Sequence, residues 1–179
     1  MRKRNRVIVS LAIALAISAF FVPVSVPQDG MNFGMEIHVD MYHYRDGVLL
    51  DHSHHPGVLT DLGANFIEQQ ISGTASTTVA VYIGLSNDAT APTSAWVVLP
   101  TEISGSGMGR ATGSYVDDGV GAWNVTNTFS VTGTQSAQLT GLYYEAAGDY
   151  LLCADQFTQV NAEDGDSLEI VWSLSVAGT

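Results

Sequence analysis

The sequence is poor in cysteine and in basic residues. Its single cysteine, Cys153, excludes an intramolecular disulfide bond, and its apolar neighbours predict a small buried side chain. Acidic residues number 18 and basic residues 6, and beyond residue 6 the only basic residues are Arg45 and Arg110. Because such an acidic surface would repel a phosphate backbone, we expect no nucleic-acid binding.

The sequence also lacks the motifs of common enzymes. It contains no Gly-x-Ser-x-Gly, and Gly105-Ser106-Gly107 has no strand and helix around it to hold a nucleophile in place. The glycines of this stretch do not form a dinucleotide fingerprint, because no strand-to-helix transition surrounds them. No nucleophile and base can be paired for a hydrolase. We therefore expect a protein that is not an enzyme and has no catalytic cofactor.

A chain of 179 residues needs only one hydrophobic core. We expect three consecutive segments within it. Residues 1–19 are predicted to be a signal peptide or membrane anchor, residues 20–32 an extended strand or linker, and residues 33–179 a β-sandwich domain.

The N-terminus is typical of a membrane-targeting segment. A basic stretch, residues 1–6, is followed by an apolar run from Val7 to Val22. The run is shorter than the roughly 20 residues that cross a bilayer, which favours a cleavable signal with cleavage after Ser18. A retained anchor extending to Val26 is the alternative, and membrane contact is then expected only through residues 7–22. In either case the basic residues stay in the cytoplasm, so we expect an extracellular or cell-surface domain.

Directly after this run, apolar residues alternate as in a β-strand that contains prolines. One row consists of Phe20, Val22, Val24 and Val26, and the other of Phe21, Pro23, Ser25 and Pro27. Because proline cannot donate to a strand ladder, such a segment belongs at the edge of a sheet. We expect it to insert into a neighbouring subunit and to build a homopolymer by strand addition. The alternative is that these residues are only the tail of the signal and a linker.

The rest of the chain reads mainly as strands with alternating apolar and polar residues. The expected strands are Phe33–Tyr44, Val48–Leu50, Val79–Leu85, Ala111–Val116, Trp123–Val131, Gln138–Glu145, Tyr150–Thr158 and Leu168–Val176. Residues 100–113 are rich in glycine and serine and are expected to form a loop. Strands at this spacing, with Gly, Thr and Asn between them, predict an antiparallel β-sandwich of the jelly-roll or immunoglobulin-like kind.

One segment, His54 to Gly73, is predicted to contain a helix. Its apolar residues form a one-sided stripe that consists of Leu62, Phe66, Ile67 and Ile71. Thr60 or Asp61 is expected to cap its start, and Gly73 to end it in a left-handed conformation. Because an isolated helix of three turns is marginal in water, we expect the strands to cover this stripe and the helix to be the central core element.

Histidines gather before this helix. The five are His38, His43, His52, His54 and His55. His52, His54 and His55 could present imidazoles to Zn²⁺ or a similar ion, with Asp51 or Asp40 as a further ligand. The alternative is a polar loop that binds nothing, since the spacing matches no closed zinc site.

Two acidic groups are candidate calcium ligands, the first Asp117 and Asp118 and the second Asp164 and Asp166. Carboxylates are the ligands that Ca²⁺ prefers, although neither group follows the regular calcium-loop pattern. Turns between strands also select aspartate and glycine for backbone reasons. Calcium at one of these loops is therefore one of two open interpretations.

Asn124-Val125-Thr126 is a sequon for N-glycosylation. With Trp123 and Val125 facing inward on a strand, Asn124 would face outward. Modification there depends on export by a host that glycosylates.

Four stretches, in order along the chain, resemble a loose family of phage and viral tail-fibre-like structural proteins and related secreted surface or filament proteins. They are His55–Thr60 with Gly63, Tyr82–Leu85, Leu99–Ile103 with Gly107–Ala111, and Ala154–Thr158 with Gly165–Trp172. The resemblance implies a β-rich subunit of an appendage or particle surface and no catalytic residues. Tail proteins are ordinarily assembled inside the cell, whereas this chain begins with an export signal. We therefore expect a secreted or anchored filament or coat subunit, with a virion protein and a membrane-anchored glycan-binding or adhesion module as alternatives.

Overall fold

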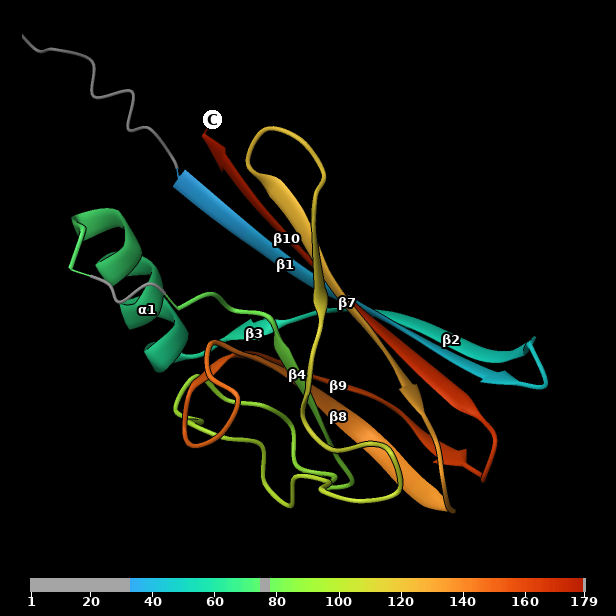
Figure 1. The fold of residues 1–179 in the computed structure, drawn as a ribbon. Helices are drawn as coiled ribbons and strands as arrows, with labels where there is room; N and C mark the ends of the chain where they lie inside the picture. The colour runs from blue at the N-terminus through green and yellow to red at the C-terminus, as the bar shows by residue number, and fades with distance from the viewer. Residues whose placement is uncertain (1–32, 75–77, 179) are drawn as a thin grey trace, which may run out of the picture. The chain divides into compact units, whose positions relative to one another are not determined.

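The computed structural model describes residues 33–74 and 78–178, which form two five-stranded sheets and one helix (Figure 1). The first sheet contains β1 (Phe33–Arg45), β2 (Val48–Pro56), β6 (Ser114–Asp117), β7 (Ala122–Ser130) and β10 (Ser167–Gly178). The second sheet contains β3 (Val58–Leu59), β4 (Tyr82–Ser86), β5 (Ala111–Thr112), β8 (Gln135–Tyr143) and β9 (Leu151–Ala162). The helix α1 is Asp61–Ser72. The predicted signal, residues 1–19, and the predicted assembly strand lie outside the described residues.

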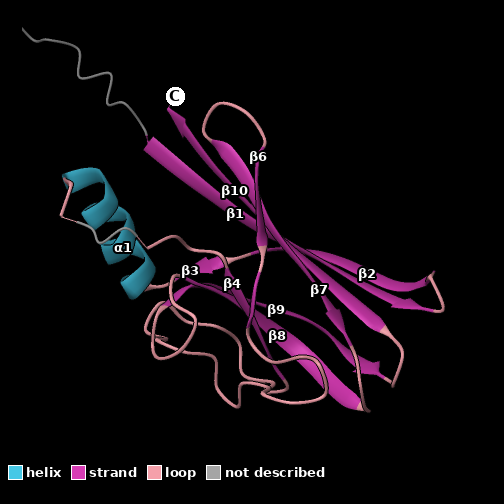
Figure 2. Cartoon of the chain, viewed as in Figure 1, coloured by secondary structure: helices cyan, strands magenta, loops and turns pink. Residues whose placement is uncertain are grey.

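Both sheets are antiparallel, as the alternation of apolar and polar residues predicts. The strand order is β2-β1-β10-β7-β6 in the first sheet and β3-β9-β8-β4-β5 in the second. β1 and β10, near the two ends of the described chain, pair in register from Phe33↔Gly178 to Tyr44↔Ser167. The prediction of a mainly β protein with antiparallel sheets and one short helix is confirmed (Figure 2).

The two sheets share one hydrophobic core. The first sheet contributes Val39, Ile170 and Trp172 to it, and the second contributes Leu142 and Phe157. Val39, Ile170 and Trp172 belong to the apolar rows of the expected strands Phe33–Tyr44 and Leu168–Val176. Burying each large apolar side chain contributes about 2 kcal/mol to folding. The sheets therefore cover each other, which gives the fold its sandwich-like arrangement without help from the helix.

The long connection between β4 and β5 is ordered by its own contacts over the outer face of the second sheet. Leu99 packs there against Leu139, Tyr143 and neighbouring buried residues. Arg110 donates from Nε and Nη2 to the two carboxylate oxygens of Glu102 at 2.8 and 2.6 Å, and its guanidinium lies 3.4 Å from the centre of the Tyr143 ring. A bidentate pair of this kind is among the stronger polar contacts in proteins. It explains why a glycine-rich loop predicted from the sequence is nevertheless fixed in place.

Helix α1 begins and ends where the sequence predicts. Thr60 is the N-cap, its Oγ1 accepting from the Gly63 backbone N–H at 2.9 Å, and Gly73 ends the helix with a φ of +72°. The first turn lies tightly against β9, because a Cβ on Gly63 would approach the Leu152 carbonyl oxygen to 2.1 Å. Thr60 reinforces this contact by donating to the Leu151 carbonyl at 2.6 Å. The helix is thus attached to the second sheet by its N-terminal turn.

The predicted role of this helix is wrong. Its only buried residue is Gly63, and Ile71 is 74% exposed. Leu62, Phe66 and Ile67 are half-buried. The reason is that the two sheets already cover each other's apolar faces, so the helix packs at their margin and its stripe is only partly covered.

Candidate docking groove

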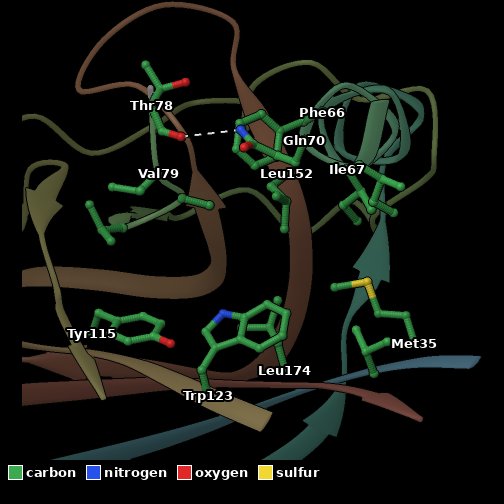
Figure 3. A pocket seen from close by; sticks show the side chains of 14 residues that line it. Met35, Phe66, Ile67, Gln70, Thr78, Val79, Tyr115, Trp123, Leu152 and Leu174 are labelled. Atoms are coloured by element: carbon green, nitrogen blue, oxygen red, sulfur yellow. Dashed lines mark hydrogen bonds between the residues drawn. The ribbon is translucent and has the colours of Figure 1, made fainter. Parts of the chain in front are cut away.

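An apolar groove of about 300 Å³ lies between helix α1 and the inner face of the first sheet (Figure 3). Its floor consists of side chains from four neighbouring strands: Met35 on β1, Leu174 and Val176 on β10, Trp123 on β7 and Tyr115 on β6. Its roof consists of Phe66, Ile67, Gln70 and Ile71 on α1 and of residues 78–81, and Leu152 lies between them. These two sets of residues are the floor and the roof of the groove.

The floor continues the apolar rows that form the core. Met35 pairs with Val176 across β1 and β10, and Leu174 pairs with Trp123 across β10 and β7. Ile37 and Leu174 are still buried, whereas Met35 and Val176 are only half-buried. The apolar alternation of these strands therefore extends beyond the cover that the second sheet provides.

The roof is incomplete. Ile71 and Val79, both in the roof, are 74% and 61% exposed, and Tyr115 at the floor is 59% exposed. Gln70 Nε2 donates to the Thr78 carbonyl oxygen at 3.4 Å, which links the helix to the other part of the roof. None of the fourteen lining residues is charged. An open, uncharged groove of this size suits apolar side chains and disfavours ionic ligands.

Sequence reasoning did not find this groove. The available signal was that the sequence has more apolar side chains than two sheets can cover. Val79, Tyr115 and Ile71 each fit an apolar pattern, yet the two sheets leave them exposed. Val79 was expected at the start of the strand Val79–Leu85, but β4 begins only at Tyr82. The buried part of that expected strand is Ile83, Gly84 and Leu85.

The histidines expected in a loop lie instead in a strand. His52, His54 and His55 belong to β2, which pairs with β1. Because successive side chains of a strand point to opposite faces, His52 and His54 share one face and His55 lies on the other. His52 Nε2 and His54 Nδ1 both donate to Oδ1 of Asp40, at 2.9 and 3.0 Å. The three predicted imidazoles therefore do not converge.

The rings around Asp40 stack on one another along the exposed face of the first sheet. The rings of Tyr42 and His52 stack with centroids 4.4 Å apart, and those of His38 and His54 with centroids 5.1 Å apart. Within residues 33–74 and 78–178, no group of three or more His, Cys, Asp or Glu side chains is arranged to hold a metal ion. The contacts that these side chains do make are with one another.

Asp166 was expected as a calcium ligand, and its surroundings contradict this. Arg45 donates from Nε and Nη2 to its two carboxylate oxygens at 2.8 and 2.9 Å, and His43 Nε2 and the Glu163 backbone N–H donate to Oδ2 at 2.9 and 2.8 Å. The hydrogen bonds from Arg45 hold the pKa of Asp166 well below its ordinary value. A carboxylate already bonded to a guanidinium has no free oxygen to offer Ca²⁺. Its partner in that prediction, Asp164, is exposed.

The other acidic pair lies in the turn before β7. Asp117 Oδ1 accepts from the Gly119 backbone N–H at 3.0 Å, and both Asp117 and Asp118 are exposed. This hydrogen bond is the backbone reason for which turns select aspartate. Asn124, the predicted glycosylation site, is half-buried in β7 between Val116 and Ser173 of the adjoining strands.

Cys153 and Asp155 are titratable groups buried in the second sheet. Cys153 is completely buried in β9, and burial raises the pKa of its thiol well above the ordinary value. Asp155 is also buried, and its Oδ2 has no hydrogen-bond partner among the described residues. Burial raises the pKa of Asp155 to about 6. Neither group lines the groove.

No helix in the described part of the chain is long and apolar enough to cross a membrane. Phe20, Val22, Val24 and Val26, the predicted assembly strand, lie outside that part.

The described residues form a mainly β protein with an uncharged apolar groove beside its helix. Comparison with known proteins adds no relative, because no family model, no curated protein and no solved structure matches the chain. The resemblance to tail-fibre-like proteins remains a prediction.

Proposed function

We propose that this protein is a secreted structural subunit of an extracellular filament, appendage or particle coat, and that it self-assembles when its N-terminal strand adds to a neighbouring subunit. The observation that carries the proposal is the open groove. Its floor and roof leave Ile71, Val79 and Tyr115 largely exposed. Contiguous apolar surface that stays uncovered on a subunit is typical of interaction sites.

The sequence contains a segment of matching character. Residues 20–26 carry a row of four apolar side chains and no charge. Covering each such side chain contributes about 1–2 kcal/mol, and several acting together can offset the cost of ordering the segment. Assembly by strand addition therefore uses apolar surface that both the groove and the segment offer.

The acidic composition is compatible with this function. The protein has a formal net charge of −12, so subunits repel one another except where apolar surface outweighs the repulsion. Polymerisation through one uncharged site then gives a defined contact and not general aggregation. We also propose that the two sheets form a sandwich of the jelly-roll or immunoglobulin-like kind.

A membrane-anchored module that binds glycans or another surface is the second candidate function. One observation favours it, the exposed face on which Tyr42, Tyr44 and His52 stack beside Asp40. Aromatic rings with polar neighbours are common at binding surfaces. A protein of this class would be a monomer after release from the membrane.

Removal of residues 19–29 tests the proposed function. The complete chain is expected to elute as polymers on size-exclusion chromatography and to form ordered filaments or sheets in electron micrographs. The truncated chain is expected to be monomeric and still folded by circular dichroism. Polymers that survive the truncation would overturn the proposal, and a monomeric complete chain would favour the binding module.

Two substitutions in the full chain refine this test. Val24→Asp places a charge in the apolar row and is expected to prevent assembly, because a carboxylate would have to be buried without a partner. Ser25→Asp adds the same charge to the opposite row and is expected to leave assembly in place. Equal effects of the two substitutions would show that charge, and not the apolar row, controls assembly.

A further inference from the structure

We infer that the groove between α1 and the first sheet is the receiving site for Phe20, Val22, Val24 and Val26 of a neighbouring copy of this chain. The inference rests on the proposed function and adds to it the surface of the partner subunit.

The charges match. None of the groove's fourteen lining residues is charged, and no charged residue occurs between Val7 and Gln28. By contrast, the exposed face around Asp40 carries a carboxylate and histidines, which an apolar row would desolvate at a cost. The groove is therefore the better receiving surface of the two.

The dimensions match. The floor crosses four neighbouring strands, from Met35 on β1 to Tyr115 on β6. Strands in a sheet lie about 4.8 Å apart, so the floor is about 14 Å long. Side chains on one face of an extended segment repeat about every 6.7 Å, so three of them cover about 13 Å. A row of three or four apolar side chains is therefore about as long as the floor when the segment runs across the strands.

The backbone of the segment suits a position with a hydrogen-bonding partner on one side only. In a strand, the N–H groups of alternate residues point to the same edge. Pro23 and Pro27 have no N–H, so the edge that contains them is incomplete, whereas the edge of Val22, Val24 and Val26 keeps every donor. Such a segment can be placed at the margin of a domain and not between two strands. The groove lies at such a margin, beside the edge strand β6.

The neighbouring copy is the source of the segment. Residues 27–32 separate it from β1, whose residue Met35 lies at one end of the floor. Docking within one copy would require the chain to reverse its direction between Val26 and Phe33 and to return over its own sheet. Docking in a neighbour requires only an extended connection, and it links each subunit to the next in the way that a polymer needs.

Val79→Asp in the full chain tests the receiving site, with Val48→Asp as the matched control. Val79 in the roof is 61% exposed and Val48 on β2, outside the groove, is 62% exposed, so both substitutions add one charge at an accessible valine. We expect Val79→Asp to weaken assembly at least about 100-fold, because the carboxylate would be buried by the incoming segment. Val48→Asp is expected to assemble like the unmodified chain. Ile71→Asp, at the other part of the roof, should repeat the loss.

The outcomes separate this inference from the proposed function. If removal of residues 19–29 abolishes assembly while Val79→Asp and Ile71→Asp do not, the function stands and the groove is not the receiving site. If Val48→Asp has the same effect as Val79→Asp, added charge alone explains the loss and the inference fails. If the truncated chain still assembles, the proposed function itself fails.

Disulfide cross-linking identifies the copy that donates the segment. Val24→Cys and Val79→Cys are prepared as separate full-length chains and mixed under mild oxidation; Cys153 is buried and does not compete. We expect a cross-linked dimer from the mixture and none from Val79→Cys alone. In the double variant, a bond formed only within single chains at every protein concentration would overturn docking between copies. Absence of any cross-link in assembled material would overturn the groove as the receiving site.

Discussion

The two ends of the first sheet differ in how its inner face is covered. At the end where β1 finishes and β10 begins, Met41, Leu168 and Ile170 are completely buried under the second sheet. At the end where β1 begins and β10 finishes, Met35 and Val176 are half-buried and line the groove. The same two strands, paired along their whole length, are thus sealed at one end and open at the other.

The sealed end is also fastened by polar contacts. Asp166, in the turn between β9 and β10, binds Arg45 and His43 of β1. The turn additionally pairs with Val131, whose N–H donates to the Asp166 carbonyl oxygen at 2.9 Å. Three parts of the chain that are distant in sequence are thereby held together at the sealed end.

Among residues 33–74 and 78–178, no ion pair of this kind lies at the open end. Its roof is a helix attached mainly through its first turn, together with residues 78–81, linked to the helix by the contact between Gln70 and Thr78. The difference teaches that strand pairing and face coverage are separate properties. Ladder hydrogen bonds carry β1 and β10 past the limit of the second sheet, and the apolar row they carry is available to another partner.

The largest expected difference in stability is between substitutions of two isoleucines, one at the sealed end and one on α1. Ile170→Ala at the sealed core should lower the free energy of unfolding by about 3–4 kcal/mol, since Ile170 is fully buried and its removal leaves a cavity. Ile71→Ala on the exposed side of α1 should change it by less than about 0.5 kcal/mol, because alanine favours the helix and little surface is uncovered. Urea unfolding followed by circular dichroism measures both. Equal losses would show that the helix is a core element after all.

The second comparison concerns two aspartates of one turn. Asp166→Asn should destabilise the fold by about 2–3 kcal/mol, because it removes the charge that the buried contacts with Arg45 and His43 require. This value is at the low end for a broken buried pair, since the Arg45 side chain is 38% exposed and partly screened by water. Asp164→Asn, two residues away and exposed, is the control and should have little effect.

The same group predicts a loss of stability in acid. Because the folded protein lowers the pKa of Asp166, its contribution is present above the ordinary pKa of 3.8 and is lost as the pH falls below it. The difference in unfolding free energy between the unmodified chain and Asp166→Asn should therefore shrink between pH 5 and pH 2. A difference that stays constant over this range would contradict the role of the charge.

Much of the fold was predictable from local patterns. The alternation in Leu168–Val176 predicted β10, and the Thr60 and Gly73 signals predicted both ends of α1. These patterns are decided by neighbouring residues, so one sequence is sufficient to detect them. The antiparallel sheets follow from the spacing of strands with turn residues between them.

What could not be predicted depends on contacts between distant residues. The histidines were expected in a loop, but pairing of His54 with Asp40 and of His55 with Val39 makes them part of β2. Asp166 was predicted to be a calcium ligand because carboxylates suit Ca²⁺. The sequence does not show that Arg45 and His43, about 120 positions earlier, form hydrogen bonds with it. The groove required knowing how far the second sheet extends over the first, which no local pattern contains.

The smallest expected effect concerns Asp155, which is buried like Asp166 but changes stability with pH in the opposite sense. Asp155 lies in β9 next to Ala154, which pairs with β3 just before the segment leading to α1, and its Oδ2 lacks a partner among the described residues. Burial raises the pKa of Asp155 to about 6 from an ordinary value of 3.8. The unfolded chain therefore loses this proton at lower pH than the folded chain, and stability falls as the pH rises from 3.8 to about 6.

Asp155→Asn removes this dependence. Relative to the unmodified chain, the variant should gain about 1–2 kcal/mol of unfolding free energy between pH 4 and pH 8, a value below the full linkage because the carboxylate can relax toward water. Comparing the two pH values cancels any constant effect of the amide on packing. The unfolding free energy of Asp166→Asn, relative to the unmodified chain, should instead fall as the pH rises from 2 to 5. The reason is that the Asp166 carboxylate is stabilised by partners that Asp155 lacks. If both variants follow the same pH dependence, the contrast between a satisfied and an unsatisfied buried carboxylate is wrong.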